Sequence, residues 1–437
     1  MNRELLKLAI PNILTNLSIP LVSMVDLGLM GRMPSTAYIL AIGFGTVIFN
    51  FVYWAFGFLR MGTTGMVSQA FGKNDQAEIK ELLRKGLIIS FSGGLLLLLL
   101  QWPLKELALI VINPDKEVIG PLLQYFDIRI YAAPATISIY VFTGWLLGMQ
   151  DAKSALILAI VVNGINATLS YLLVVYTSLS IEGVALGTVV AQYCGLAIAI
   201  LLLLKKHRLS LKAVFSNSKS QKSAWKDFVL INSDIFIRTL CLIFVMSFFK
   251  TKAGNIDPIL GAANILLLEF ITISAYGIDG FAFAAESICG KYFGRADQAA
   301  FKRSVNLSMI WGIGIAALLS LCYWLFGKEI LFLLTDKDKL VDAALIYLPW
   351  LIAAPVVNAF AFIWDGIYVG TTSSKAMRNT MLLSTFVVFL PIFFIAKANL
   401  QNHGMWLAFT LFMLSRGVFQ SFLAKRYVFS RLRPTSE

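Results

Sequence analysis

The most constraining feature of this chain is an internal duplication, because the sequence matches itself when it is shifted by 222 positions. Residues 71–77 (FGKNDQA) return as residues 293–299 (FGRADQA). At the same offset, a second group returns: Gly144, Gly148 and Lys153 reappear as Gly366, Gly370 and Lys375. Two separate matches at one offset predict a repeated unit of about half the chain, which in a membrane protein is typical of transporters.

Composition indicates that the repeat lies in a membrane. The chain is 58% hydrophobic and 14% charged, with a mean hydropathy of +0.77, whereas soluble domains carry about 25% charged residues. Apolar stretches of about 20 residues predict twelve spans: 8–31, 38–61, 86–111, 120–148, 154–177, 181–204, 227–249, 258–290, 304–326, 342–370, 377–396 and 402–426. Six spans per repeat is an even number, so we expect an all-α polytopic membrane protein built from two parallel six-helix repeats.

The loops predict the domain boundaries and the orientation. We expect an N-terminal lobe over 1–204, a basic and Ser-rich cytoplasmic linker over 205–226, and a C-terminal lobe over 227–437. With the N-terminus inside, 24 Lys and Arg residues fall in inner segments and 9 in outer loops. Loops rich in Lys and Arg stay on the cytoplasmic side, so both termini are expected in the cytoplasm. The chain as a whole is expected in the inner membrane of the cell. The net charge of +13 then reflects topology, and no nucleic-acid partner is expected.

Ionisable groups at membrane depth are functional candidates, because each costs several kcal/mol unless it is paired or hydrated. Asp26 lies late in the first span, without a basic residue within a turn. It therefore needs a proton, a cation, or a hydrogen-bonding partner on another helix. The neutral polar residues that we expect to face it lie in the fifth and sixth spans: Asn163, Asn166, Ser170, Thr188 and Gln192. Pro11 and Pro20 are expected to kink the first span, because proline removes an intrahelical hydrogen bond.

The second lobe carries more ionisable residues. Asp234 and Arg238 are spaced i,i+4, so we expect them to pair on one helix face. Glu269 shares a face with Asn264 and Thr272 and is expected to line a polar cavity, with Asp279 and Glu286 further along the same span. Asp365 precedes Gly366 and is expected to cap or line an inner gate.

Catalytic and metal motifs are not apparent. The two histidines, His207 and His403, lie in predicted loops, and the sequence shows no His-carboxylate cluster, nucleophile elbow or phosphate-binding loop. We therefore expect neither an enzyme nor a cofactor.

The chain resembles the multidrug and toxic compound extrusion (MATE) family, and within it the DinF-like branch. The resemblance covers nearly the whole length and rests on several segments: Ala9-Ile10-Pro11, Val25-Asp26, residues 57–65, Ala133-Pro134, residues 144–148, 234–239 and 279–286, Asp365-Gly366 and Met377-Arg378-Asn379.

The resemblance implies two six-helix lobes, a central cleft open to either side in turn, and export driven by inward movement of protons or sodium. It makes Asp26 the coupling acid and Pro11 the bend of the first helix. The family usually carries Asn and, four residues later, Asp in the fifth span. Here these positions hold Asn166 and Ser170. The usual sodium site is therefore incomplete, and Asp26 is the sole acid of its lobe.

We expect a monomeric antiporter in the lipid bilayer that exports amphipathic or cationic small molecules in exchange for H+, with Na+ near Asp26 as the alternative ion. A flippase for lipid-linked saccharides is an alternative, but it would line its cleft with several basic residues for pyrophosphate. The predicted spans include few basic residues, among them Arg60, Arg129, Arg238 and Arg416, mostly near span ends. A membrane-embedded transferase is a second alternative, but it would need a catalytic His or paired acids at a membrane surface, and the sequence shows neither. A channel would need a filter-like loop, which the sequence also lacks.

Overall fold

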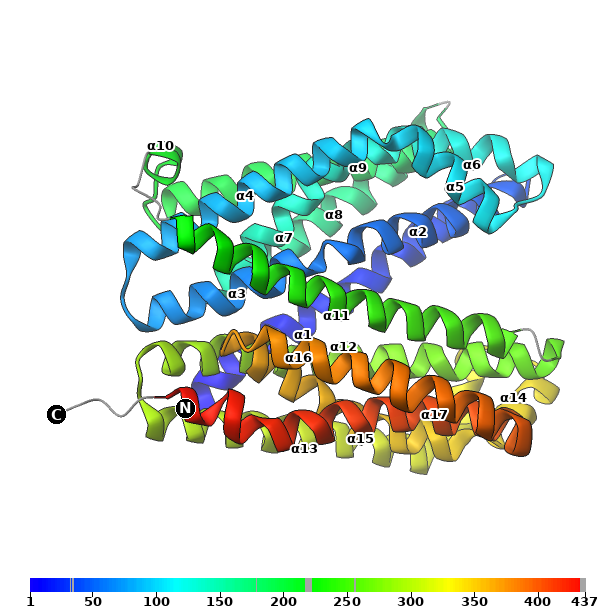
Figure 1. The fold of residues 1–437 in the computed structure, drawn as a ribbon. Helices are drawn as coiled ribbons and strands as arrows, with labels where there is room; N and C mark the ends of the chain where they lie inside the picture. Colours follow the sequence, from blue (N-terminus) through cyan, green and yellow to red (C-terminus); the bar gives the residue numbers. More distant parts are fainter. Residues whose placement is uncertain (32, 34, 178, 217–221, 255–256, 433–437) are drawn as a thin grey trace. The chain divides into compact units, whose positions relative to one another are not determined.

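The part of the chain that the computed structural model describes is helical throughout and contains no strand (Figure 1). The description covers every residue except 32, 34, 178, 217–221, 255–256 and 433–437, and it leaves out the side chains of 222–224. The α-helices are α1 (Asn2–Met30), α2 (Ala37–Ala55), α3 (Gly57–Gly72), α4 (Gln76–Leu99), α5 (Gln101–Ile112), α6 (Lys116–Arg129), α7 (Ala133–Gly148), α8 (Ala152–Tyr176), α9 (Ile181–Lys205), α10 (Leu211–Phe215), α11 (Lys222–Gly254), α12 (Pro258–Gly294), α13 (Gln298–Phe332), α14 (Asp338–Leu345), α15 (Leu348–Gly370), α16 (Ser374–Leu383) and α17 (Leu390–Tyr427).

Helices of membrane-spanning length account for most of the chain. Eleven described segments are long and apolar enough to cross a bilayer, and the last of them, Ser374–Arg431, is 58 residues long. This last segment contains two predicted spans, because the chain reverses at Gln401, where φ is 49° and ψ is −122°. Gly404 then packs so closely on the preceding turn that an added Cβ would lie 2.2 Å from the Ala396 carbonyl oxygen. The predicted all-α polytopic membrane fold is confirmed.

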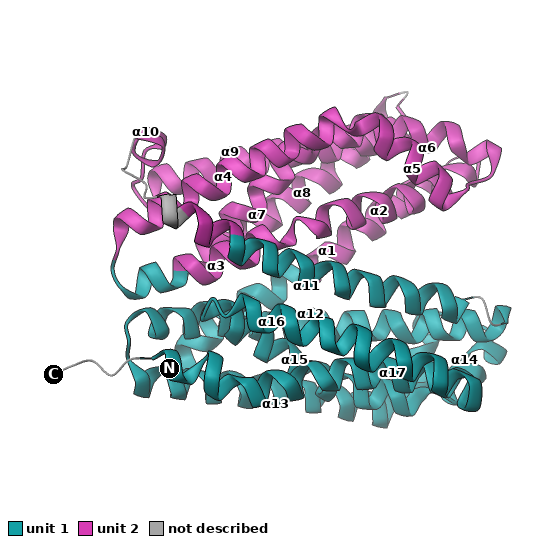
Figure 2. Ribbon diagram, viewed as in Figure 1, with its two compact units in different colours: residues 1–16, 68–74, 230–437 teal, residues 17–67, 75–229 magenta. Residues whose placement is uncertain are grey.

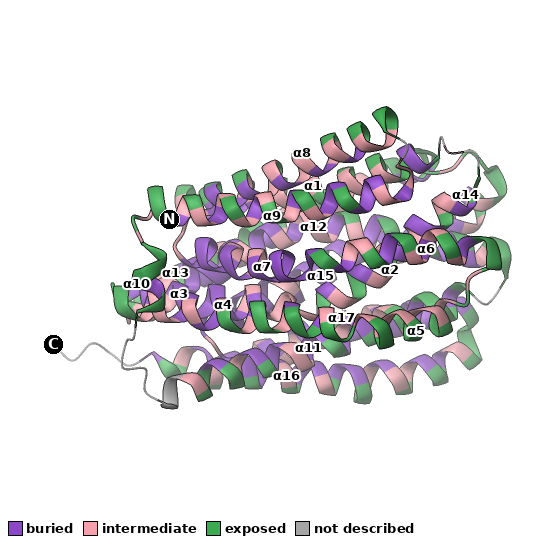
Figure 3. Cartoon of the chain, turned by 90° about the horizontal axis from the view of Figure 1, so that it is seen from above, coloured by how far each residue is buried: buried purple, intermediate pink, exposed green. Residues whose placement is uncertain are grey.

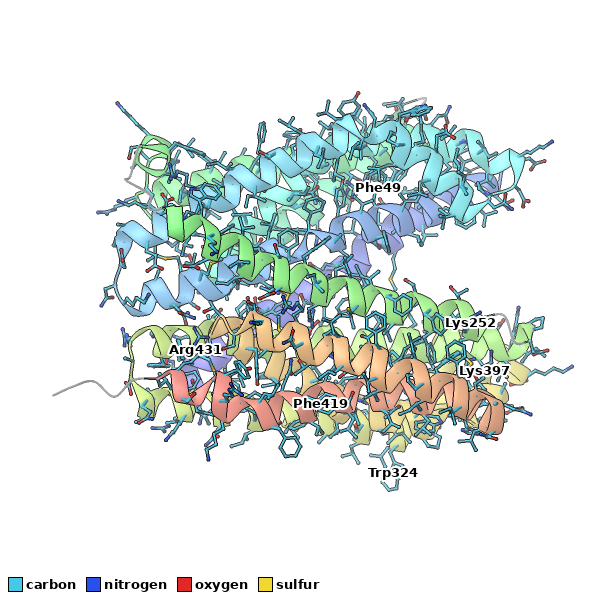
Figure 4. All side chains as sticks on the ribbon, viewed as in Figure 1. Phe49, Lys252, Trp324, Lys397, Phe419 and Arg431 are labelled. Atoms are coloured by element: carbon cyan, nitrogen blue, oxygen red, sulfur yellow. The ribbon has the colours of Figure 1, made fainter. Side chains whose placement is uncertain are left out.

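Burial follows the position of each helix in its unit (Figure 3). In the most apolar window of Lys116–Gly148, 78% of the residues are buried, against 17% in that of Gln298–Phe332. Many large apolar side chains elsewhere are exposed, and Trp324 stands clear of the helices in Figure 4. Tryptophan on a spanning helix is commonly found at a membrane–water interface.

Packing divides the helices into two units (Figure 2). We call residues 17–67 and 75–229 the N-terminal unit, and residues 1–16, 68–74 and 230–437 the C-terminal unit. This division differs from the predicted lobes at the start of α1 and at the end of α3, both of which pack with the C-terminal unit. Glu4 pairs with Lys291 at 2.5 Å, and Asn16 donates to the Tyr276 carbonyl at 3.2 Å.

The first helix therefore belongs to both units. It is continuous from Asn2 to Met30, and the unit boundary falls after Asn16, between Pro11 and Pro20. The Thr15 hydroxyl donates to the Pro11 carbonyl at 2.9 Å, which supports the backbone one turn beyond the first proline. The predicted kink at these prolines stays a prediction.

The repeat is visible in the backbone of both units. Non-glycine residues with positive φ recur at the 222-residue offset: Asn74 and Ala296 both have φ of 57°, and Gln150 and Thr372 have φ of 63° and 51°. Each pair ends a helix, where a left-handed residue closes the last turn. These shared helix ends show that the two halves keep one backbone design.

Close helix contacts recur at the same offset. A Cβ added to Gly144 would lie 2.4 Å from the Arg60 carbonyl oxygen, and one added to Gly366 would lie 2.3 Å from the Ala282 carbonyl oxygen. Arg60 and Ala282 are themselves 222 residues apart. In both units only glycine lets the two helix backbones approach so closely.

The turns that follow α7 and α15 are stabilised by different hydrogen bonds. In the N-terminal unit, Asp151 caps α8 by accepting from the Ser154 N–H at 3.2 Å and also binds Lys206 and His207. Burial works to raise the pKa of Asp151, but the hydrogen bonds from His207, Lys206 and Ser154 outweigh it and hold the pKa well below its usual range. In the C-terminal unit, Arg431 (labelled in Figure 4) donates to the Ser373 hydroxyl at 2.9 Å, so that turn uses a neutral acceptor.

The predicted linker is packed rather than fully exposed. Ser210 caps α10 by accepting from the Ala213 N–H at 3.1 Å, and Val214 is buried where α10 lies against α4. The Trp225 ring lies 5.5 Å from the Lys85 ammonium nitrogen of α4. Residues 217–221 of this segment lie outside the described residues. The described ends of the linker therefore belong to the N-terminal unit.

Candidate functional site

The candidate site of the N-terminal unit is centred on Asp26 of α1. Its Oδ1 is buried and has no hydrogen-bond partner among the described residues. The Ser170 side chain of α8 lies beside the carboxylate, although its buried Oγ forms no hydrogen bond of normal geometry. With this oxygen buried and unpartnered, an ionised carboxylate loses hydration there without a hydrogen bond in exchange.

A pair of neutral side chains continues the site. Asn166 of α8 donates to the Thr188 hydroxyl of α9 at 2.8 Å, and Thr188 donates to the Val184 carbonyl at 2.9 Å. With these two bonds made, the buried Oδ1 of Asn166 has no hydrogen-bond partner within the described residues. Asn166 and Ser170 are one helical turn apart, so their unpartnered oxygens lie on the same face of α8.

Gly187 explains why α8 and α9 approach so closely here. A Cβ added to Gly187 would lie 2.8 Å from the Ser170 backbone nitrogen and 3.0 Å from its Oγ. The small residue on α9 therefore makes room for the polar turn of α8.

The other two predicted members of this site differ in their placement. Asn163 reaches α1, where its amide donates to the Ser18 hydroxyl at 2.7 Å. Gln192 is partly exposed one turn beyond Thr188, and the described hydrogen bonds do not join it to the cluster. The structure thus brings Asn163, Asn166, Ser170 and Thr188 together with α1.

The same unit holds a basic residue that lies within a predicted span. Arg129 closes α6, and its Nε and Nη1 are buried without a hydrogen-bond partner among the described residues. Its guanidinium carbon lies 5.4 Å from the centre of the Phe49 ring (labelled in Figure 4) and 5.6 Å from that of Tyr53. An arginine inside an apolar span is itself a signal of a functional position.

The C-terminal unit holds its buried acid differently. Asp365 of α15 is 4% exposed, and its Oδ2 accepts hydrogen bonds from both Arg238 and Arg416. Gln420 donates to Oδ1 at 2.6 Å. Three donors from α11 and α17 hold Asp365 inside the unit, and the prediction that it caps or lines an inner gate stays a prediction.

The predicted local pair of Asp234 and Arg238 is also wrong. Asp234 accepts from Arg378 at 2.6 Å and from the Ser374 hydroxyl at 2.9 Å, both on α16, while Arg238 turns to Asp365. Spacing of i,i+4 permits an ion pair on one helix. Here both side chains instead bind partners on neighbouring helices.

The remaining second-lobe residues do not line one cavity. Glu269 is exposed, whereas Asn264 is fully buried and bonds Asn402 at 2.9 Å and the Trp406 indole nitrogen at 2.9 Å. The two side chains therefore lie on opposite faces of α12, so the prediction of a shared cavity fails.

Two acids lie further along α12. Asp279 is partly buried and acts electrostatically on Arg416. Glu286 is 1% exposed, deeper along the helix. Among the described residues, no group of three or more His, Cys, Asp or Glu side chains is arranged to hold a metal ion.

A duplicated chain of membrane-spanning helices, with buried polar clusters inside each packed unit, belongs to the class of polytopic α-helical membrane proteins. The MatE family model matches residues 11–172 and 236–395. The chain therefore belongs to the MatE family of multidrug and toxic compound extrusion transporters, whose members handle small molecules in the membrane.

Individual relatives agree with this assignment. The chain is 32% identical to the DNA damage-inducible protein F of Escherichia coli over 98% of its length and 92% of that protein. It is 24% identical to a probable multidrug resistance protein NorM of Rhizobium meliloti, over 94% of this chain and 91% of that protein.

Solved structures show the same fold. A MOP superfamily transporter from Pyrococcus furiosus matches with a TM-score of 0.88 at 16% identity, covering 99% of this chain and 97% of that one. A multidrug resistance MATE transporter in an outward-facing conformation also matches with a TM-score of 0.88, at 18% identity over 99% of this chain and 97% of that one.

Proposed function

We propose that this protein is a secondary active antiporter that exports amphipathic or cationic organic compounds in exchange for protons that bind Asp26. The observation that carries the proposal is the buried Oδ1 of Asp26, which has no hydrogen-bond partner among the described residues. A carboxylate in that environment is suited to take up a proton and release it again when its surroundings change. The relatives named for multidrug resistance support an organic substrate.

The neutral residues around Asp26 give the proton a structural effect. Ser170 lies beside the carboxylate, and Asn163 ties α8 to Ser18 of the same helix that carries Asp26. Hydrogen bonds to an ionised and to a protonated carboxylate differ in direction, since only the protonated form donates. Protonation therefore favours a different packing of α1 against α8, and this difference is the two-state element that a transporter needs.

Sodium is the alternative coupling ion. Three buried oxygens have no hydrogen-bond partner in the described part of the chain and are chemically suited to a hard cation: Asp26 Oδ1, Asn166 Oδ1 and Ser170 Oγ. Only Asp26 among them carries charge, so this set fits sodium less well than a set with two carboxylates would.

We further propose a monomer in the inner membrane, with both termini in the cytoplasm, in accord with the charge of the loops. The flippase alternative receives little support, because Arg238 and Arg416 are both held by Asp365 and are not arranged around an open phosphate site.

Transport by the purified protein in liposomes tests the proposed function. We expect uptake of a fluorescent organic cation when a proton gradient alone is imposed, and no uptake when a sodium gradient alone is imposed. Transport driven only by sodium would assign sodium as the coupling ion. Movement of a lipid-linked saccharide without either gradient would support the flippase.

A further inference from the structure

The turn that follows α9, together with the short helix α10, forms an exposed surface that the proposed transport chemistry does not use. We call residues 205–215 the linker turn. Its two large apolar side chains on the surface are Leu211 and Phe215, which are 38% and 51% exposed. They are one helical turn apart, so they share one face of α10, while Val214 is buried where α10 lies against α4. Figure 3 shows the exposed side of α10 in green.

Basic side chains flank this apolar pair. Lys205, Arg208 and Lys212 are exposed, and none of their side chains has an ion pair or a hydrogen bond among the described residues. The acid that reaches this turn, Asp151, is already occupied by Lys206. The linker turn therefore presents three positive charges without counter-charges beside two exposed apolar side chains.

The backbone of the linker turn is held by hydrogen bonds. The Lys206 N–H donates to the Leu202 carbonyl at 3.0 Å, and the Leu209 N–H donates to the Leu203 carbonyl at 3.1 Å. Arg208 has a φ of 53°, the left-handed conformation that commonly closes a helix end. A partner therefore meets a surface that is already ordered, and little conformational entropy is lost on binding.

The position of the linker turn along its neighbouring helices places it at a membrane surface. Helix α9 ends at Lys205, one residue beyond the predicted span 181–204. Helix α10 packs on α4 (Figure 1), and Lys85 of α4 directly precedes the predicted span 86–111. The Trp225 ring lies 5.5 Å from the Lys85 ammonium nitrogen, and tryptophan is enriched at membrane–water interfaces. The linker turn is therefore expected at the level of the lipid headgroups.

We propose that the linker turn is a docking site for anionic phospholipid, an inference that goes beyond the proposed function and does not depend on it. The three basic side chains bind lipid phosphates, and the two apolar side chains lie among the upper parts of the acyl chains. Charge complementarity selects this partner, because a neutral lipid offers no net negative charge to the three cations. A basic segment with an apolar face beside it is typical of membrane-surface anchors.

Lipid binding to the purified full chain, resolved by native mass spectrometry in detergent, tests this inference. Phosphatidylglycerol is the anionic probe, and phosphatidylcholine with the same acyl chains is the neutral one. We expect tighter binding of phosphatidylglycerol by the wild type. Lys212→Gln should weaken that binding about fivefold and Arg208→Gln/Lys212→Gln about 25-fold, with phosphatidylcholine unaffected. Lys116→Gln is the matched control and should bind both lipids as the wild type does, since Lys116 is an exposed lysine at the start of α6.

The apolar part of the surface has its own readout. Phe215→Ser should weaken phosphatidylglycerol and phosphatidylcholine by the same factor, because it removes a contact with acyl chains and leaves the charges in place. Glycerol phosphate, which carries the phosphate without acyl chains, should not displace the bound lipid at equal concentration.

Four outcomes would overturn the proposal. These are equal affinities of the wild type for the two lipids, unchanged phosphatidylglycerol binding by the double Gln variant, an equal loss in Lys116→Gln, or displacement of the lipid by glycerol phosphate. The altered side chains are exposed, so the variants are expected to fold, and melting in detergent checks this. Should the double Gln variant be unstable, Arg208→Lys/Lys212→Arg compared with the single Lys212→Gln variant still decides, because only the first keeps both charges and should bind as the wild type does.

Discussion

Among the described residues of the N-terminal unit, the buried Oδ1 of Asp26 is without a hydrogen-bond partner, whereas in the C-terminal unit Asp365 binds two arginines and a glutamine. The 222-residue offset places Phe248 opposite Asp26 in the repeat, and Thr143 opposite Asp365. The duplicated glycine contacts and helix ends are shared, but the buried acids are not. One scaffold therefore carries an acid that can change its protonation in one unit and an acid held by fixed partners in the other.

The largest effect is expected from Asp26→Asn, which mimics the protonated state permanently. The variant should fold and bind substrate but lose proton-driven export to the level of empty liposomes, because the proton has no group to bind. Asp127→Asn is the matched control, since Asp127 is an exposed residue of the same unit paired with Lys105. Export at the wild-type rate by Asp26→Asn would move the coupling role to the C-terminal unit, with Asp234 and Glu269 tested first.

The second effect is a loss of stability from Asp365→Asn. Removing this charge leaves Arg238 and Arg416 buried without their counter-ion, which is expected to cost about 3–5 kcal/mol. In detergent, Asp365→Asn should lower the melting temperature by a large amount. Asp234→Asn should lower it less, because the partner of Asp234, Arg378, is 26% exposed. A fully stable Asp365→Asn variant that no longer transports would reverse the comparison and make Asp365 the coupling acid.

The third effect tests the shared scaffold. Gly144→Ala and Gly366→Ala each place a methyl group against a helix carbonyl, which is expected to cost about 1–3 kcal/mol in either unit. Gly164→Ala and Gly314→Ala are the matched controls, since an added Cβ at either meets no atom within 4 Å. Melting temperatures measure all four variants. A loss in one unit only would show that the repeats do not depend on the same contact.

The smallest effect on stability is expected at the turns that follow α7 and α15. Asp151→Asn is expected to lower stability by roughly 1 kcal/mol at neutral pH, a modest value because Lys206 is half exposed. The pKa of Asp151 is depressed in the folded chain, so its contribution is fully present above the unfolded pKa near 4 and is lost as the pH falls through the folded pKa. Ser373→Ala in the other unit should show no such pH dependence, and parallel melting curves for the two variants in acid would contradict this.

Features that depend on local pattern can be predicted from this sequence. The repeat, the spans and most members of the Asp26 site follow from offsets, apolar runs and helical spacing, and Asn166 and Thr188 are indeed bonded. The predicted pair of Asp234 and Arg238 is wrong, because spacing on one helix says nothing about partners on other helices. These partners are Arg378 for Asp234 and Asp365 for Arg238. The sequence places Arg129 within a predicted span, but only packing shows that its guanidinium lies against the rings of Phe49 and Tyr53.

Because α1 belongs to both units, the packing of its N-terminal part is delayed during synthesis. Asn16 cannot make its bond to Tyr276 until 260 further residues have been translated. At roughly 5–20 residues per second, that takes about 10–50 s. Through this interval, residues 2–16 are made but have no docking partner, whereas residues 17–30 can already pack with the helices that follow them. The oldest part of the chain thus completes the youngest unit, and more than half of the chain must be translated before the N-terminal end of α1 is secured.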